Sequence, residues 1–228
     1  MAISNYTELN TAVANWLDRD DLTDRIPEFI VLAEARFNRL LRIRAMEEKQ
    51  TASTVAGQRN LALPTNFIQM RNLQINTSPI TPMQYVTPEI YDRLYGSTQT
   101  GTPEFYTIIA DELQLGPIPG SAQTIEMLFY KKFDALTPSA STNWMITNAP
   151  DVYLYGCLLE AEPFIMNDPR VQLWATAFQQ AISDIQEQDN KDRHSGSALR
   201  VMNTSGYYCQ PRYHGRKPLL RYTGVTLE

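Results

Sequence analysis

Residues 151–164 read DVYLYGCLLEAEPF, and this stretch constrains the fold more than any other part of the chain. From Val152 to Met166 almost every side chain is apolar or aromatic, and a helix that is apolar on all sides is buried on several of them. Glu160 and Glu162 interrupt the run. Because buried charges usually persist by being paired, we predict an ion pair with an arginine of the helix expected over residues 23–46 in preference to a catalytic role.

This stretch is expected to form a helix over residues 149–166, and three further helices are expected around it. Residues 23–46 place apolar side chains on one helical stripe, and residues 168–194 do the same as far as Ile185. Residues 4–17 read as a shorter amphipathic helix. Between Ile185 and Ser197 there is no large apolar residue, so the last helix is predicted to leave the core there and to project or fray.

The predicted helix over residues 23–46 gathers four arginines toward its C-terminal end, where positive charge complements the helix dipole. They are Arg36, Arg39, Arg42 and Arg44. We interpret this outer face as solvated or as forming salt bridges between subunits. A nucleic-acid patch is the alternative.

The hydrophobic period changes between residues 47 and 133, where short runs rich in β-branched and aromatic residues are separated by Gly and Pro. Strands are expected at residues 59–63, 67–75, 105–109, 112–115 and 124–130, with one short helix over residues 87–94. The predicted fold class is therefore α+β: a helical bundle of long helices with an inserted, small, mostly antiparallel β-domain and an extended C-terminal arm.

The domain boundaries follow from these changes in pattern. The expected segments are residues 1–46 (N-terminal helices), 47–140 (inserted β-domain), 141–194 (C-terminal helices) and 195–228 (arm). The ordinary composition, with 43% hydrophobic and 20% charged residues among 228, favours a globular protein. No run reaches the roughly 20 apolar residues of a membrane span, and the N-terminus lacks a signal-peptide layout, so we expect no membrane association and a cytoplasmic site of synthesis.

The chain offers few residues for catalysis or metal binding. It has two cysteines and two histidines, without metal-ligand spacing, and none of the common phosphate-, nucleotide- or hydrolase-type motifs. The acidic pairs Asp20–Asp21, Glu47–Glu48 and Asp111–Glu112 are sequence neighbours, so their carboxylates diverge. We therefore expect no catalytic residues, no metal, no cofactor and no enzymatic activity.

The net charge of −5 is unevenly distributed. Residues 195–228 carry +4, and the rest of the chain carries −9. Tyrosines and basic residues alternate in this arm, and both are enriched where proteins bind one another. Its candidate interface residues are Arg200, Tyr207, Tyr208, Arg212, Tyr213, Arg216, Lys217, Arg221 and Tyr222. We favour docking on a protein, and single-stranded nucleic acid is the alternative.

Several stretches of the sequence follow one another in a fixed order. One is the helix of residues 151–164, preceded by Trp144 and followed by Asp168 and Trp174; the others are residues 14–22, 26–30, 33–36, 101–106 (GTPEFY), 112–119 (ELQLGPIP) and 128–130 (LFY). In this combination they resemble the head-to-tail connector adaptor proteins of tailed phages. The resemblance spans residues 5–185, whereas the arm is interpreted from its composition alone.

This resemblance implies a structural virion protein that joins the portal to the tail nozzle. It implies self-assembly into a ring, commonly twelvefold, through which packaged double-stranded DNA passes without specific binding. The expected partners are further copies of the chain, the portal protein and a tail nozzle or other tail protein. The expected location is the head–tail junction of the virion, after assembly in the host cytoplasm.

Two functions of other classes remain as alternatives. A single-stranded nucleic-acid-binding protein would use the basic, tyrosine-bearing arm, and its binding would weaken as salt rises. A cell-wall hydrolase would need a convergent carboxylate pair. If the chain forms a ring, its acidic body predicts a negative lumen, for which Asp184, Glu187 and Asp189 are candidate residues.

Overall fold

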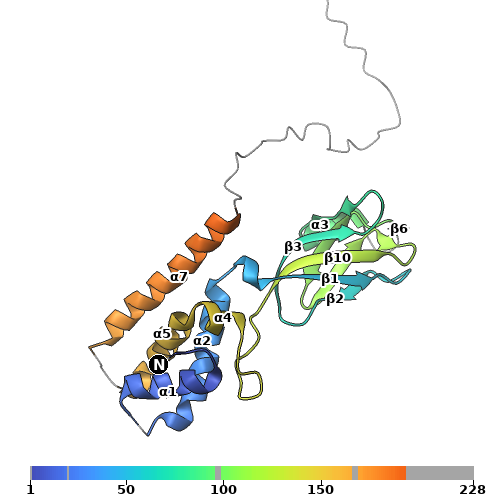
Figure 1. Ribbon diagram of the computed structural model, residues 1–228. Helices are drawn as coiled ribbons and strands as arrows, with labels where there is room; N and C mark the ends of the chain where they lie inside the picture. Colours follow the sequence, from blue (N-terminus) through green and yellow to red (C-terminus); the bar gives the residue numbers. More distant parts are fainter. Residues whose placement is uncertain (1, 20, 96–98, 166–168, 194–228) are drawn as a thin grey trace, which may run out of the picture. The chain divides into compact units, whose positions relative to one another are not determined.

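The computed structural model describes residues 2–19, 21–95, 99–165 and 169–193 (Figure 1). Residues Met1–Arg193 form one compact unit. Helices occupy both ends of this unit, and the strands lie between them in sequence, so the protein is α+β. The inserted, mostly antiparallel sheet region expected from the sequence is confirmed.

Two of the helices in this unit begin after an asparagine cap. The side chain of Asn5 accepts a hydrogen bond from the backbone N–H of Glu8, and Asn143 accepts one from Ile146. The elements are α1 (Tyr6–Leu17), η1 (Thr23–Arg25), α2 (Ile26–Leu40), η2 (Arg44–Met46), α4 (Trp144–Asn148), α5 (Pro150–Glu160), α6 (Glu162–Ile165) and α7 (Val171–Arg193). Of the described helices, α7 is the longest at 23 residues.

Two predicted helices are shorter than expected. The helix predicted over residues 23–46 ends at Leu40, because Leu41 is extended and the chain then buries Leu41 and Ile43 in alternation. The helix predicted over residues 149–166 is interrupted at Ala161, since Pro163 cannot occupy the interior of a continuous helix. The expected bundle of long helices is therefore a set of shorter helices around α5.

The strands form two four-stranded sheets, ordered β1-β10-β3-β4 and β2-β8-β7-β5, and a short pair β6-β9. Pairing is antiparallel except for the two-residue pairs β5–β7 and β6–β9. The elements are β1 (Glu47–Ser53), β2 (Asn60–Ala62), β3 (Phe67–Ile75), β4 (Thr81–Pro82), β5 (Gln84–Tyr85), α3 (Pro88–Tyr95), β6 (Thr100–Gly101), β7 (Phe105–Ile109), β8 (Glu112–Gly116), β9 (Ile118–Pro119) and β10 (Thr124–Lys131). Among the strands of the described residues, β1 is the one long strand that was not predicted from the sequence.

Two separate clusters of buried apolar side chains hold the helices and the sheets. In the helical cluster α5 lies at the centre, since a Cβ atom added at Gly156 would lie 3.1 Å from Ala33 Cβ and 3.4 Å from Phe178 Cε2. Both α2 and α7 therefore approach α5 closely at this glycine. Of the helices in the described ranges, none combines the length and the apolar character that a membrane span requires.

Candidate assembly interface

The four arginines predicted on one helical face have different environments. Arg36 binds Glu160 of α5, with 2.7 Å between Arg36 Nη2 and Glu160 Oε1, and its guanidinium also lies over the Phe178 ring. The predicted ion pair between the central helix and an arginine of an earlier helix is thereby confirmed. The second carboxylate of that run, Glu162, is exposed. Arg36 thus serves the packing of the helices within the chain.

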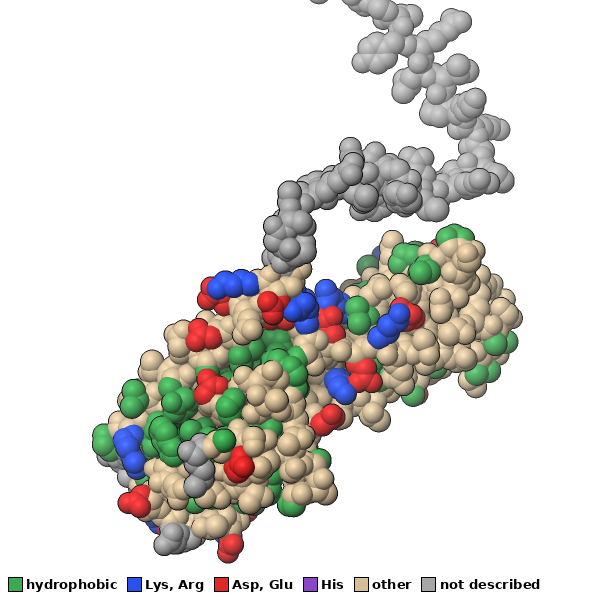
Figure 2. Space-filling view, in the orientation of Figure 1, with side chains coloured by type: hydrophobic (Ala, Val, Ile, Leu, Met, Phe, Trp, Pro, Cys, Tyr) green, Lys and Arg blue, Asp and Glu red, His purple; other side chains and the backbone are tan. Residues whose placement is uncertain are grey.

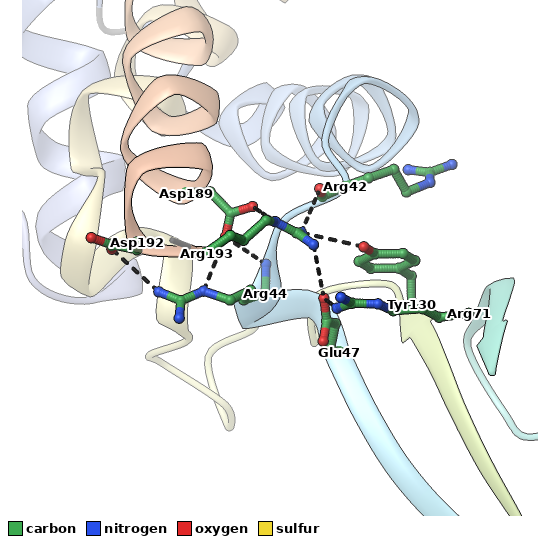
Figure 3. A network of polar contacts seen from close by, with 8 residues as sticks. All are labelled: Arg42, Arg44, Glu47, Arg71, Tyr130, Asp189, Asp192 and Arg193. Atoms are coloured by element: carbon green, nitrogen blue, oxygen red, sulfur yellow. Dashed lines mark hydrogen bonds and ion pairs between the residues drawn. The ribbon is translucent and has the colours of Figure 1, made fainter. Parts of the chain in front are cut away.

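Arg44 belongs to a polar network at the end of α7 (Figure 3). Its backbone N–H donates to Asp189 Oδ1 at 2.8 Å, and its side chain lies 3.3 Å from Asp192. In the same network Arg193 binds Asp189 at 2.6 Å and Glu47 of β1 at 3.5 Å. Figure 2 shows side chains of both charge signs gathered around this end of α7.

The last helix leaves the apolar core after Ile185, as predicted, but within the described residues it does not fray. The helix continues to Arg193, whose guanidinium also donates to the hydroxyl of Tyr130 on β10 at 3.3 Å. Arg71 of β3 shares the carboxylate of Glu47. The C-terminal turn of α7 is thus held by ion pairs and hydrogen bonds where apolar side chains are missing.

The charges of this network stabilise one another. Burial by itself would raise the pKa of Asp189, but hydrogen bonds from Arg44 and Arg193 outweigh burial and hold its pKa below the usual range. The hydrogen bond to Asp189, followed by the one to Tyr130, raises the pKa of Arg193. The side chain of Asp189 is only 10% exposed, so this carboxylate has a structural role in the described chain.

Arg39 and Arg42 line a groove beside α2 with a volume of about 640 Å³. Lys132, which follows β10, lines the same groove. Arg42 Nη1 donates to the carbonyl oxygen of Asn38 at 2.8 Å, while Arg39 and Lys132 are exposed. The remaining lining residues are Val31, Glu34, Ala35, Asn38, Asn66, Phe67, Ile68, Phe133, Asp134 and Ala135. We call this surface the basic groove.

A buried carboxylate lies on the floor of the basic groove. Glu34 is 8% exposed and accepts hydrogen bonds from the backbone N–H of Leu136 at 2.7 Å and from the Tyr153 hydroxyl at 2.9 Å. Burial raises the pKa of Glu34 despite these hydrogen bonds, and burial also raises the pKa of Tyr153. Glu34 thus connects α2, α5 and the segment that leaves β10.

An acidic segment lies at the other end of α2. Residues 18–24 read DRDDLTD, with four aspartates and one arginine. Asp18, Asp21 and Asp24 are exposed, and Arg19 pairs with Asp21. We call residues 18–24 the acidic turn. Helix α2 therefore separates a negative surface at its beginning from a positive surface at its end.

The three acidic residues predicted to line a lumen differ in their surroundings. Asp184 and Glu187 are exposed on α7, where they contact Gln180 and Lys191 respectively. Asp189 is committed to the polar network. The predicted interface residues of the arm, from Arg200 to Tyr222, lie outside the described residues.

Sequence reasoning missed three residues of these surfaces: Lys132, Glu34 and Glu47. A lysine directly after a strand, or a glutamate on an otherwise apolar helix stripe, carries no signal until its neighbours in space are known. Among the described residues, no group of three or more His, Cys, Asp or Glu side chains is placed to hold a metal ion.

The described chain thus carries exposed carboxylates before α2 and a groove with three cationic side chains at its end. The family model of the SU10 adaptor protein matches residues 4–202. The chain therefore belongs to the SU10 adaptor protein family, a phage head-tail adaptor family. No curated protein matches the chain significantly.

Membership in this family confirms the resemblance seen in the sequence. The chain is a structural virion protein of a bacteriophage, with a place at the head–tail junction and contacts to other head or tail proteins. The match extends past the described residues into the first part of the arm.

Proposed function

We propose that this protein assembles into a closed ring between the portal and the next tail component, and that packaged DNA passes through the ring without specific binding. The observation that carries the proposal is the family match over residues 4–202. A ring is also the closed solution for subunits that present two different surfaces to their neighbours. The basic groove and the acidic turn supply two such surfaces on one subunit.

Imaging of assembled particles tests this proposal. The purified protein is mixed with the portal protein of the same phage and examined by mass photometry and negative-stain electron microscopy. Rings seated on the portal are the expected result. Separate subunits beside unoccupied portals, at concentrations well above those in an infected cell, would contradict the proposal.

The helices expected at residues 23–46, 149–166 and 168–194 form the rigid body of the subunit in this proposal, and residues 47–140 form the inserted β-domain. The separate apolar clusters of helices and sheets support this division. The arm of residues 195–228 docks on the portal or on the adjacent subunit. Ordering the arm only against a partner would delay ring formation until the portal is present.

Deletion of residues 196–228 tests the role of the arm. The shortened protein should keep its circular dichroism spectrum and lose binding to the portal. Unchanged affinity for the portal would exclude the arm from docking. Binding of the full chain to single-stranded DNA that disappears on deletion, with portal binding intact, would favour the nucleic-acid alternative.

An acidic lumen completes the proposal, because negative charge would let DNA slide past without adhering. Asp184 and Glu187 are the better candidates for this role, since both are exposed. Replacing both with lysine should slow DNA ejection from assembled particles. Unchanged ejection and unchanged DNA retention would remove these two residues from the lumen.

A further inference from the structure

The basic groove holds positive charge that the described part of the chain does not neutralise. Arg39, Arg42 and Lys132 have no carboxylate partner among the described residues, whereas Arg36 and Arg44 both have one. The groove also contains two carboxylates, which leaves an excess of one positive charge over its lining residues. Glu34 is bound to Leu136 and Tyr153 in the floor, and Asp134, which lines the groove, lies 4.0 Å from Lys131.

The walls of the basic groove are apolar as well as charged. Val31 is 61% exposed, and Phe67, Phe133 and Ala135 also line the groove. A surface with apolar walls and cationic edges suits a protein segment that carries carboxylates next to apolar side chains. The chemistry of the occupant is therefore an acidic stretch of polypeptide.

The acidic turn presents the exposed carboxylates of Asp18, Asp21 and Asp24, and it lies far from the cationic edge of the groove in its own subunit. Asp24 precedes α2 and Arg39 lies in its last turn, so the two are 15 positions apart, about 22 Å at the helical rise. Two complementary surfaces that are separated on one subunit can meet only between subunits, in a head-to-tail contact. We propose that the acidic turn of one copy binds the basic groove of the next copy in the ring. This inference rests on the proposed function.

Other occupants fit the groove less well. The arm of residues 195–228 carries +4 and would be repelled by three cations. DNA would meet a subunit body with a net charge of −9, and the apolar walls offer nothing to phosphates. The acidic turn brings four aspartates against one arginine, so its sign is opposite to that of the groove.

Charge exchange between two variants tests the proposal. The groove variant is Arg39→Glu with Lys132→Glu, and the turn variant is Asp21→Lys with Asp24→Lys. Each variant alone places like charges opposite one another and should assemble on the portal with an affinity weaker on the order of a hundredfold. A mixture of the two variants restores opposite charges at every contact and should form rings again.

The matched control is Arg93→Glu with Lys191→Glu, which reverses two exposed cations away from the groove and should assemble as the wild type does. All four side chains of the test variants are exposed, and circular dichroism melting curves verify that each variant is folded.

Absence of rings for the wild type overturns the proposed function itself. If the wild type forms rings and the groove variant forms them equally well, this inference alone is overturned. The same holds if the mixture of the two variants forms no rings. Loss of duplex DNA binding by a groove variant that still forms rings would likewise overturn it.

Discussion

The two halves of α7 are held by different forces. The first half buries Trp174, Phe178, Ala181 and Ile182 in the helical cluster. The second half, from Gln186 to Arg193, buries none of its side chains as deeply and is bound through Asp189 and Arg193. Apolar burial involves no titrating group and is not weakened by charge screening, whereas ion pairs depend on pH and are screened by salt. The end of α7 that leads into the arm is therefore the half whose attachment responds to its surroundings.

Removal of the Phe178 ring from α7 should lower the free energy of unfolding more than the other substitutions considered below. Phe178 is 1% exposed and lies against Gly156, so Phe178→Ala leaves a cavity among α2, α5 and α7. We expect a loss of about 3–5 kcal/mol in the free energy of unfolding, measured by urea denaturation. The control Leu173→Ala, on the same helix but 70% exposed, should change stability by less than about 0.5 kcal/mol. Similar losses for both variants would contradict the comparison.

Replacing the buried carboxylate of Glu34 should lower the free energy of unfolding by an intermediate amount. Glu34→Ala leaves the backbone N–H of Leu136 and the Tyr153 hydroxyl without this acceptor, which should cost about 1–3 kcal/mol. Glu34→Gln keeps an acceptor oxygen and should retain most of the stability. Equal losses for Ala and Gln would show that the charge, and not the acceptor, matters at this position.

The pH dependence gives a second measurement on the same pair of variants. Because burial raises the pKa of Glu34 above its value of 4.5 in the unfolded chain, the folded state binds this proton more tightly. The resulting stability is fully present below pH 4.5 and is lost as pH rises through the folded pKa. Relative to Glu34→Gln, the wild type should therefore lose stability as pH rises from 4.5 to the raised pKa of Glu34 in the folded state. A parallel pH dependence of the two proteins would contradict the raised pKa.

The apolar parts of the fold could be predicted well, because buried faces of helices and strands place apolar residues at regular spacings in the sequence. The strands at residues 67–75 and 105–109 were predicted with the bounds that the structure has, and the central helix begins within one residue of its predicted start but ends at Glu160. No such period is present in β1. Its residues read EEKQTAS, and their hydrogen bonds to β10 and an ion pair from Lys49 to Glu126 stabilise the strand.

The polar surfaces were harder to predict for the same reason. Four arginines on one helix looked alike in the sequence, yet two of them have partners more than a hundred positions away, Glu160 and Asp189. Pairing of this kind depends on which elements meet in space. The polar end of α7 was taken for a free end because its partners, Arg44 and Glu47, lie in segments whose positions the sequence alone does not reveal.

Removing the contacts between the polar half of α7 and the sheet should have the smallest effect on the free energy of unfolding. It should nevertheless raise local hydrogen–deuterium exchange clearly. Arg193→Ala removes the contacts to Asp189, Glu47 and Tyr130, and we expect a loss of about 1 kcal/mol. Hydrogen–deuterium exchange should rise in the last turn of α7 and at the start of β1 while remaining unchanged near Phe178.

The neighbouring ion pair provides the control. Lys191 binds Glu187 at 2.8 Å within α7, and both side chains are exposed, so Lys191→Ala should leave the melting temperature and the exchange of β1 unchanged. High salt should reproduce part of the Arg193→Ala pattern in the wild type, since screening weakens the same partly exposed contacts. Equal hydrogen–deuterium exchange of β1 in the wild type and in Arg193→Ala would contradict the comparison. The apolar contacts of Ile68 and Tyr130 with the helical cluster would then connect the sheet to the helices, and both halves of α7 would depend on apolar burial.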